Sequence, residues 1–237
     1  MEVKLLHSTP LEIADIAICK CYGNEPHSDE AKVKARINRV ANVSKHASTI
    51  EHITFSFDID GVSRACLQEI CRHRISSYTV KSSRYTLKEL KKEDEFVREG
   101  VNEKGNISIT VTDELVERAS KYVVLTGNSQ VDISIMEALE NLRFKVLQDI
   151  PNDIAKYCMP EAYKTSLVMT INARALQNFL ELRSSKHALW EIQKLAKAMY
   201  DVLPENHKFL FDYIYEKENS NGIWNYNIRE RGCWKDT

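Results

Sequence analysis

The sequence predicts an α+β protein in which a few strands are combined with many helices. Residues 51–59 alternate apolar and polar side chains, which is the pattern of a strand with one buried face. Residues 131–150 instead carry apolar side chains at helical spacing. The strand and helix patterns do not alternate regularly along the chain, which favours α+β over a repeated β–α–β architecture. With 237 residues the chain is long enough to bury a core, and one domain spanning residues 1–237 is expected.

Four segments are predicted to be strands because they are short and their apolar residues are mainly β-branched or aromatic. They lie at residues 3–6, 51–59, 107–111 and 165–171. In the second segment Ile53, Phe55, Phe57 and Ile59 alternate with polar residues, so one face should be buried. The fourth segment, TSLVMTI, is compact, β-branched and apolar, which favours a buried strand.

Helices are predicted where apolar side chains recur every three or four residues. They cover residues 10–23, 33–41, 113–124, 131–150, 172–183, 187–200 and 205–215, and a further helix starts near residue 62. Pro10 stands near the start of the first helix, Asp113 can cap the helix that follows it, and Pro151 interrupts the pattern after residue 150. The highly charged residues 88–99 are interpreted as a solvated helix face or a connection.

The charge of the whole chain is balanced, with 33 Lys and Arg against 34 Asp and Glu. No overall field attracts the protein to nucleic acid or to a membrane, so neither partner is expected and anion binding should be local. The six cysteines form no CxxC pair and no metal-ligand spacing, which predicts reduced, mostly buried thiols and no metal site. The N-terminal residues lack the features of a signal or transit peptide, so a cytoplasmic protein is expected.

A local anion site is predicted in the basic stretch at residues 72–85, RHRISSYTVKSSRY. Its guanidinium groups and hydroxyls suit a phosphate or another planar anion. The alternative is a solvated basic loop, which is the usual form of a charge run. The apolar residues of 62–70 lead directly into these charges, which favours a site held by the protein core. The seven glycines form neither a GxGxxG pattern nor a Walker loop, so a nucleotide would not bind through those motifs.

Three further groups of residues are weaker candidates. Polar residues of KHASTIEH, at 45–52, precede the strand at 51–59, but they also suit an ordinary turn. In the helix at 172–183, Arg183 closes an apolar stripe, where a cation needs a partner or must extend to water. Arg174 and Asn178 fall on the other side of the same helix. The segment HALWEI, at 187–192, carries a Trp that is more often part of a core than of a ligand site.

Taken together, the order and spelling of these motifs resemble the flavin-dependent thymidylate synthases. The hallmark of that family is Arg-His-Arg, seven residues and Ser, and it matches Arg72, His73, Arg74 and Ser82. The segments EHITFSF, NARALQNFLELR and HALWEI are similar to a strand, a helix and a following segment of the family. The resemblance covers at least residues 46–85 and 156–193.

The resemblance implies a compact fold with a central, mostly antiparallel sheet surrounded by helices. It also implies conversion of dUMP to dTMP, with methylenetetrahydrofolate as the carbon donor. FAD would carry the redox chemistry and NADPH would reduce the flavin. A homotetramer would build each active site from several subunits.

The resemblance assigns roles to individual residues. The residues that match the family's FAD site are His46, Ser48, Glu51, Arg72, His73, Arg74, Asn172, Arg174 and Asn178. The residues that match its dUMP site are Glu69, Arg72, Lys81, Ser82, Ser83, Arg84, Lys156 and Arg183. Arg183 matches the arginine that is thought to polarise the uracil ring, and it is the catalytic candidate. The two faces of the helix at 172–183 would then serve two ligands, FAD on the side of Arg174 and dUMP on the side of Arg183.

The chain departs from the common family pattern at five positions. Many members have Gln, Asn, Glu, Gly and Arg where this chain has Glu69, Thr79, Val80, Ser83 and Lys156. A lysine can still meet a phosphate, although as a point charge and not as a fork. No neighbouring base is evident for Ser82, so this residue is assigned to dUMP binding and not to nucleophilic catalysis.

Two other functions remain open at this point. A non-catalytic nucleotide or RNA-binding protein could use the same basic stretch at 72–85, because its cations are interleaved with tyrosines. Alternatively, the basic stretch could stabilise an oligomer. The nearly neutral charge of the chain makes the RNA-binding alternative weaker than the enzyme.

Overall fold

The computed structural model describes residues 1–101 and 107–214, and their contacts group them into two compact units. Unit 1 contains Met1–Asp60, Gln68–Thr79 and the described residues from Ser166 onward. Unit 2 contains Gly61–Leu67 and the described residues of Val80–Thr165. Each unit is considered by itself, and a single domain over the whole chain stays a prediction.

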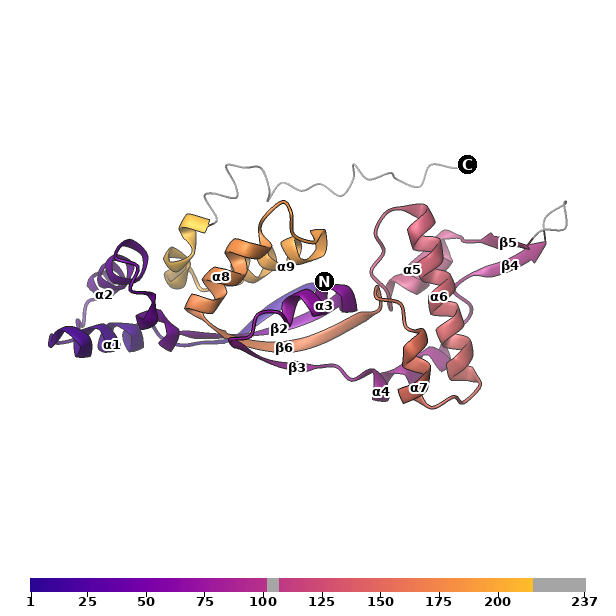
Figure 1. Cartoon of the computed structure of the whole chain (residues 1–237), viewed down its shortest axis with the longest axis horizontal. Helices are drawn as coiled ribbons and strands as arrows, with labels where there is room; N and C mark the ends of the chain where they lie inside the picture. Colours follow the sequence, from indigo (N-terminus) through magenta and orange to yellow (C-terminus); the bar gives the residue numbers. More distant parts are fainter. Residues whose placement is uncertain (102–106, 215–237) are drawn as a thin grey trace. The chain divides into compact units, whose positions relative to one another are not determined.

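A four-stranded sheet has the strand order β1-β2-β6-β3 (Figure 1). Its strands are β1 (Glu2–Ser8), β2 (Thr54–Ser63), β6 (Lys164–Asn172) and β3 (Ser76–Val80). Strands β1 and β2 pair antiparallel. Ser56 contacts Thr170 at 2.8 Å and the Ala173 amide donates to the Ile53 carbonyl at 2.8 Å, so β2 and β6 also run in opposite directions. The predicted α+β class with a mostly antiparallel sheet is confirmed.

Strand β2 has the burial pattern that its sequence predicts. Phe55, Phe57 and Ile59 are fully buried, whereas the polar residues between them are partly exposed. Strand β6 alternates in the same way, and Val168 is 38% exposed. The prediction of a buried strand at 165–171 therefore holds for one face only, because a β-branched run is compatible with one covered face and one open face.

Helices α8 (Ala173–Arg183) and α9 (Trp190–Asp201) lie together on one face of this sheet (Figure 1). Their apolar side chains, among them Leu176, Phe179 and Leu195, are fully buried. Burial of this kind contributes roughly 1.5–3 kcal/mol for each large apolar side chain. The packing fixes the axis of α8 and therefore the direction in which its polar side chains project.

The remaining helices of unit 1 follow the sequence prediction in position, but not always in type. They are α1 (Glu12–Tyr22), α2 (Glu30–Ile37), a π-helix at Asn38–Val43 and 3-10 helices at Ala47–His52 and Glu205–Leu210. Gly23 ends α1 with a φ of +65°, which a residue without Cβ adopts readily. Residues 51 and 52 belong to a 3-10 helix and not to the predicted strand. The end of the helix predicted at 205–215 lies outside the described residues.

Unit 2 has its own buried core. Its elements are α4 (Ser83–Thr86), a 3-10 helix at Leu87–Lys92, β4 (Arg98–Val101), β5 (Ile107–Thr110), α5 (Asp113–Ser120), α6 (Ser129–Leu147), α7 (Asn152–Ala155) and a 3-10 helix at Lys156–Cys158. Strands β4 and β5 form an antiparallel pair. Helix α3 (Arg64–Ile70) carries the chain from unit 2 into unit 1. The core of unit 2 is built mainly from α5, α6 and the segment 87–97.

Four sequence predictions are corrected here. The charged segment 88–99 is not simply solvated, because it buries Leu90, Phe96 and Val97 and enters β4. The helix expected to reach residue 124 ends at Ser120, since the following residues extend and bridge to Tyr163. Strand β3 was not predicted, because its short polar sequence lacks an apolar alternation. Of the five described cysteines only Cys19 and Cys66 are buried, so most of these thiols are not.

Within the part of the chain that the structure describes, no helix combines the length and apolar character that crossing a membrane requires.

Candidate active site

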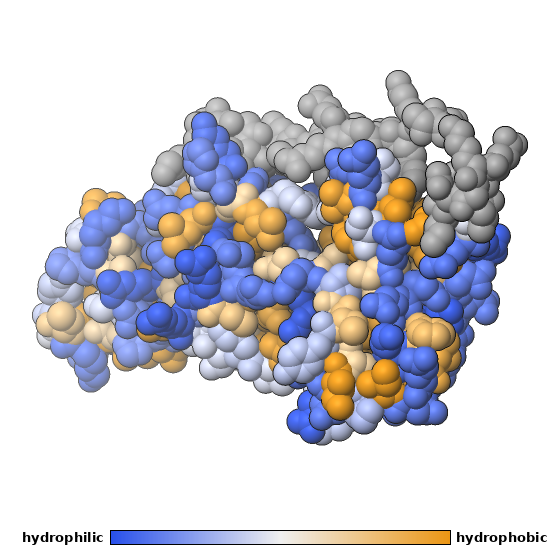
Figure 2. Space-filling model, turned by 45° about the vertical axis from the view of Figure 1, so that its right-hand side comes forward, coloured by the Kyte–Doolittle hydropathy of each residue, from blue (hydrophilic) through white to orange (hydrophobic). Residues whose placement is uncertain are grey.

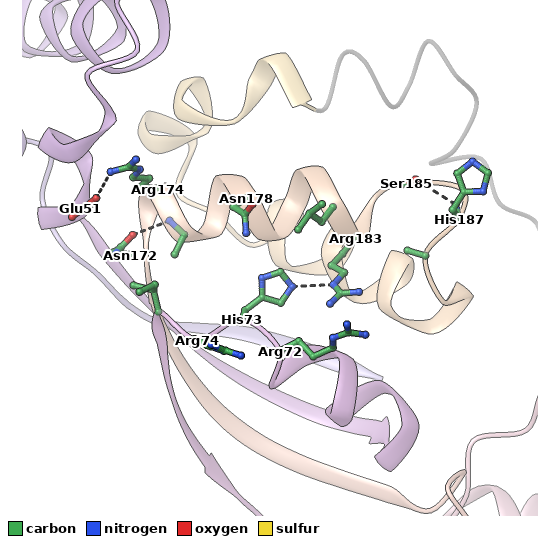
Figure 3. A pocket seen from close by; sticks show the side chains of 14 residues that line it. Glu51, Arg72, His73, Arg74, Asn172, Arg174, Asn178, Arg183, Ser185 and His187 are labelled. Carbon is green, nitrogen blue, oxygen red and sulfur yellow. Dashed lines mark hydrogen bonds and ion pairs between the residues drawn. The ribbon is translucent and has the colours of Figure 1, made fainter.

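A pocket of about 950 Å³ lies in unit 1, beside α8 (Figure 3). Three segments that are distant in sequence line it: the 3-10 helix at 47–52, the turn that follows α3, and α8 with the loop after it. Its lining residues are Glu51, Arg72, His73, Arg74, Ile75, Asn172, Arg174, Ala175, Asn178, Leu182, Arg183, Ser185, His187 and Ala188. Four arginines against one carboxylate make the lining suited to an anionic ligand.

Helix α8 starts directly at the end of β6, without an intervening loop. Asn172 is the last residue of the strand and also the N-cap of the helix, where its side-chain oxygen accepts a hydrogen bond from the Ala175 amide at 2.8 Å. The Ala173 amide donates to the Ile53 carbonyl of the neighbouring chain segment at 2.8 Å. These two hydrogen bonds fix the start of α8 to the sheet.

The guanidinium of Arg183, at the end of α8, makes three hydrogen bonds. Its Nε donates to His73 Nε2 at 2.9 Å, its Nη1 to Glu69 Oε2 at 2.7 Å and its Nη2 to the Glu69 carbonyl at 3.0 Å. The Arg183 side chain is only 15% exposed, so it keeps little contact with water. A guanidinium has five N–H donors, and among the described residues three of them are used. Two donors are left for a ligand.

His73 is buried between α8 and the turn that follows α3. Its ring packs edge-on against Phe179, with 4.7 Å between the ring centroids. Burial, reinforced by the positive charge of Arg183, lowers the pKa of His73 from 6.5 to about 4. The imidazole is therefore neutral at pH 7. Because Nε2 accepts a hydrogen bond from Arg183, the proton of the neutral ring lies on Nδ1.

Tyr78 of β3 stabilises the turn that carries the three basic residues 72–74. Its hydroxyl lies 2.6 Å from the His73 carbonyl and 3.0 Å from the Ile70 carbonyl. The His73 amide also donates to the Ile70 carbonyl at 3.1 Å. The main chain at His73 is thus held at both its amide and its carbonyl, which fixes the origin of the imidazole side chain.

Arg174 lies near the other end of the pocket, where it forms an ion pair with Glu51 at 2.6 Å (Figure 3). The two side chains are 56% and 44% exposed, so this pair adds no more than about 1 kcal/mol to stability. Arg72 is more exposed still, at 72%, and contacts Glu69 at 3.4 Å. These two arginines can therefore change partners readily when an anion enters the pocket.

The structure brings together most of the residues that the sequence assigns to FAD. Seven of the nine line the pocket. The two that do not are both exposed: His46 is the N-cap of the neighbouring 3-10 helix, and Ser48 lies within that helix. The division of α8 between two ligands, FAD near Arg174 and dUMP near Arg183, stays a prediction. Arg174, Asn178 and Arg183 all line one pocket, because long side chains reach it from different positions around the helix.

The residues assigned to dUMP fall into both units. Arg72 and Arg183 line the pocket of unit 1, and Glu69 contacts both of them. Lys81, Ser82, Ser83, Arg84 and Lys156 belong to unit 2 and do not line that pocket.

Within unit 2, α4 contacts α7, and the Asn152 side chain donates to the Arg84 carbonyl at 2.7 Å. Lys81 forms an exposed ion pair with Glu89 at 3.7 Å. Lys156 directly follows α7, and α7 contacts α4, so Lys156 is close in the fold to residues of α4 that are distant in sequence. The residues of 82–84 and Lys156, all assigned to dUMP, therefore belong to one region of unit 2.

Sequence reasoning missed several lining residues, namely Ile75, Ala175, Leu182, Ser185 and Ala188. Ala175 and Leu182 lie three residues before and four residues after Asn178, so helical spacing could have placed them on the same face. Ile75 and the residues of the loop after α8 carry no comparable signal. They lie outside helices and strands, so their positions depend on how the chain turns at these places.

The fold and the pocket define an α+β protein with a site for a large anionic ligand such as a nucleotide. Comparison with known proteins identifies the family within this class. Residues 4–207 match the family model described as "Thymidylate synthase complementing protein". A flavin-dependent thymidylate synthase of Wolinella succinogenes is 53% identical over 213 residues, which are 89% of this chain and 97% of that protein. One of Campylobacter jejuni is 49% identical over 220 residues, which are 92% and 99% of the two chains.

A solved structure agrees with the sequence relatives. The chain superposes on the crystal structure of Thymidylate Synthase X from Helicobacter pylori with FAD and dUMP, with a TM-score of 0.82 and 47% identity. The match covers 90% of this chain and 98% of that one. The chain belongs to the flavin-dependent thymidylate synthase family, as its sequence motifs predict.

Proposed function

We propose that this protein converts dUMP to dTMP, with methylenetetrahydrofolate as the carbon donor and FAD, reduced by NADPH, as its redox cofactor. One observation carries the proposal. The Arg72–Arg74 motif and the polar residues of α8 line one pocket, although about 100 residues separate them in sequence. They do so in a member of a family in which the Helicobacter pylori protein was crystallised with FAD and dUMP.

The residues of the pocket fit a flavin dinucleotide. Its diphosphate needs cationic or amide donors, and Arg72, Arg74 and Arg174 present exposed guanidinium groups. Its planar ring needs apolar contact, which Ile75, Ala175 and Leu182 can supply. The volume of about 950 Å³ is at the upper end of the range for small-molecule sites. When bound, FAD would supply the redox chemistry that protein side chains lack.

Roles are assigned to the lining residues on the same basis. We assign FAD to Glu51, Arg72, His73, Arg74, Asn172, Arg174 and Asn178, with His46 and Ser48 nearby. We assign dUMP to Glu69, Arg72, Lys81, Ser82, Ser83, Arg84, Lys156 and Arg183. The cations of the second group suit the phosphate of a nucleotide, and its hydroxyls suit the remaining polar atoms.

Arg183 is the residue assigned to catalysis. Carbon 5 of uracil becomes nucleophilic when negative charge develops on the ring, and a fixed guanidinium stabilises that charge. Arg183 is fixed by three hydrogen bonds and is largely removed from water, so its charge acts more strongly than a solvated one would. Because the uracil is polarised in this way, the protein needs no covalent nucleophile.

A homotetramer with shared active sites is part of the proposal. Within unit 2 several large apolar side chains are exposed, namely Tyr85, Phe144, Leu147, Ile154 and Tyr157. Figure 2 shows apolar surface among polar residues on the face that it draws. Exposed apolar groups of this kind favour association with another chain. The cytoplasmic location expected from the sequence also belongs to the proposal.

Two measurements test this function. The absorption spectrum of the purified protein, with and without added FAD, should show a flavin band. Release of tritium from carbon 5 of labelled dUMP should depend on methylenetetrahydrofolate and NADPH. A protein that gains no flavin band and releases no tritium contradicts the proposal. Strongly salt-dependent RNA binding in that same protein would instead support the non-catalytic alternative.

A further inference from the structure

We propose that His73 is a positioning residue for Arg183, and that it acts as a neutral imidazole whose Nε2 accepts the hydrogen bond from Arg183 Nε. The inference rests on the proposed function, because Arg183 is the residue assigned to polarising the uracil. It concerns a contact between two side chains of this chain, and it gives His73 a role in addition to its assignment to the FAD site.

The geometry gives His73 a contact that no other side chain in the described residues replaces. Glu69 accepts hydrogen bonds from both terminal nitrogens of Arg183, one with its carboxylate and one with its carbonyl. His73 alone accepts from Nε, at 2.9 Å. Contacts to all three nitrogens fix both the position of the guanidinium and the orientation of its plane. Without the contact at Nε, the plane can turn about its remaining partners.

The protonation state of His73 decides whether this contact can exist. A protonated imidazole has an N–H at both nitrogens, so it could not accept from Arg183 and would place two positive charges side by side. Burial of His73 and, after it, the positive charges of Arg183 and Arg72 oppose protonation and outweigh the opposite effect of Glu69, so the pKa falls to about 4. The charged neighbours of the ring are Arg183, Glu69 and Arg72. The neutral form is therefore the form present at physiological pH.

The main chain supports the same role. The His73 amide and carbonyl are both hydrogen-bonded, to Ile70 and Tyr78, so the backbone at this residue is fixed. The Phe179 ring then restricts the side chain from one side. Because its backbone and its ring are both held, His73 can orient a flexible arginine whether or not it also contacts the ligand.

Two substitutions separate the hydrogen bond from the volume of the ring. In His73→Gln the side-chain oxygen can still accept from Arg183, whereas in His73→Phe the ring is kept and the acceptor is lost. We expect kcat for dTMP formation to fall on the order of 10- to 100-fold in His73→Phe, as for a misplaced catalytic group. His73→Gln should retain most of kcat. Because His73 is also assigned to the FAD site, kcat is measured at saturating FAD and expressed per bound flavin, and flavin content per subunit should be equal in the two variants. The exposed His7 supplies matched controls, His7→Gln and His7→Phe.

Each other outcome contradicts the proposal. Equal losses of kcat in the two variants would show that catalysis does not depend on a hydrogen-bond acceptor at residue 73. Wild-type kcat in both would show that Arg183 needs no such partner. Loss of flavin in His73→Phe but not in His73→Gln would show that the fall in kcat comes from the cofactor and not from the orientation of Arg183.

A second measurement does not depend on activity. In protein labelled with 15N-histidine, the signals that disappear in His73→Phe belong to His73. At pH 7 they should show a neutral ring with hydrogen on Nδ1 and none on Nε2. A proton on Nε2 would overturn the positioning role even if the enzyme is active. Conversely, the expected tautomer in a protein that forms no dTMP would refute the proposed function and leave this contact intact.

Discussion

The Glu69 carboxylate lies 2.7 Å from the Arg183 guanidinium, although 114 residues separate the two in sequence. The pair joins the last turn of α3 to the last turn of α8 within unit 1. Glu69 also contacts Arg72 at 3.4 Å, so one carboxylate serves two arginines of the pocket. At this position many family members have Gln, which offers an acceptor without a charge.

Glu69 is therefore expected to tolerate Gln better than Ala. Glu69→Gln keeps a side-chain acceptor for Arg183, and we expect kcat to change by less than about threefold, within the difference between a charged and a neutral hydrogen bond. Glu69→Ala leaves one terminal nitrogen without its partner, and kcat should fall by about tenfold or more. Steady-state kinetics at saturating dUMP measure both. Similar kcat values for the two variants would contradict a role for this contact.

Arg183→Ala should abolish dTMP formation while FAD stays bound. Removal of one group that stabilises developing negative charge lowers kcat on the order of 100- to 1,000-fold. Arg183→Lys should rescue little, because an ammonium cannot reproduce the fork of contacts to Glu69 and His73. Tritium release from carbon 5 of dUMP and the flavin spectrum are the two readouts. Arg98→Ala, which removes an exposed arginine of unit 2, is the matched control.

Arg174→Ala should weaken FAD binding before it affects catalysis. Arg174 is exposed and, among the residues that the structure describes, forms an ion pair only with Glu51, so its charge is available to the cofactor. Loss of one charge-assisted contact, about 1.5–3 kcal/mol, corresponds to a roughly 10- to 100-fold rise in the Kd for FAD. Titration of the apoprotein with FAD measures it. Because Arg174 and Arg183 line one pocket, equal loss of FAD in Arg174→Ala and Arg183→Ala would show that their roles are not separate.

Stability should fall when the pH is lowered from about 6.5 to about 4. Over this range the unfolded chain protonates His73, while the folded protein, in which its pKa is about 4, does not. The unfolded state then binds more protons, which costs at most about 3 kcal/mol of stability from this group. Urea unfolding at pH 7 and pH 4.5 measures the change. In His73→Gln the difference between the two pH values should be smaller, and an unchanged difference would contradict the assignment.

Lys156 tests the assignment of unit 2 residues to dUMP. Lys156→Ala should raise the KM for dUMP by about tenfold, since it removes one charged contact of about 1.4 kcal/mol or more. Lys156→Arg should stay close to the wild-type KM, because it restores the residue that many family members have. Lys88→Ala, at another exposed lysine of unit 2, is the matched control. A KM that is equal in Lys156→Ala and the wild-type protein would remove Lys156 from the site.

The sequence predicts the fold best where burial is periodic. Strand β2 and helix α8 are recognisable because every second, or every third and fourth, residue is apolar, and the structure buries those residues. Strand β3 has no such pattern, because it is short and partly exposed. The segment at 88–99 has a sequence dominated by charged residues, which predicts exposure to solvent. Its few apolar residues give no periodic pattern, yet Phe96 and Val97 are buried.

The candidate site was predicted by residue type but not by geometry. The Arg72–Arg74 motif and the helix at 172–183 identified the family and the main lining residues. The pairs Arg183–Glu69 and Arg174–Glu51 could not be predicted, because each joins residues more than 100 positions apart through the tertiary fold. The tautomer of His73 depends on its hydrogen bond with Arg183, which lies 110 positions further along the chain, so it too required the structure.

The direct junction of β6 and α8 at Asn172 has a mechanical consequence. Eleven residues of α8 separate Asn172 from the end of the helix at Arg183, a length of about 16 Å at 1.5 Å per residue. A rotation of the helix by only about 4° at Asn172 would displace its far end by about 1 Å. A shift of that size takes a hydrogen bond of 2.9 Å beyond its useful range. A small change of twist in the sheet would therefore be enough to release the guanidinium from its partners.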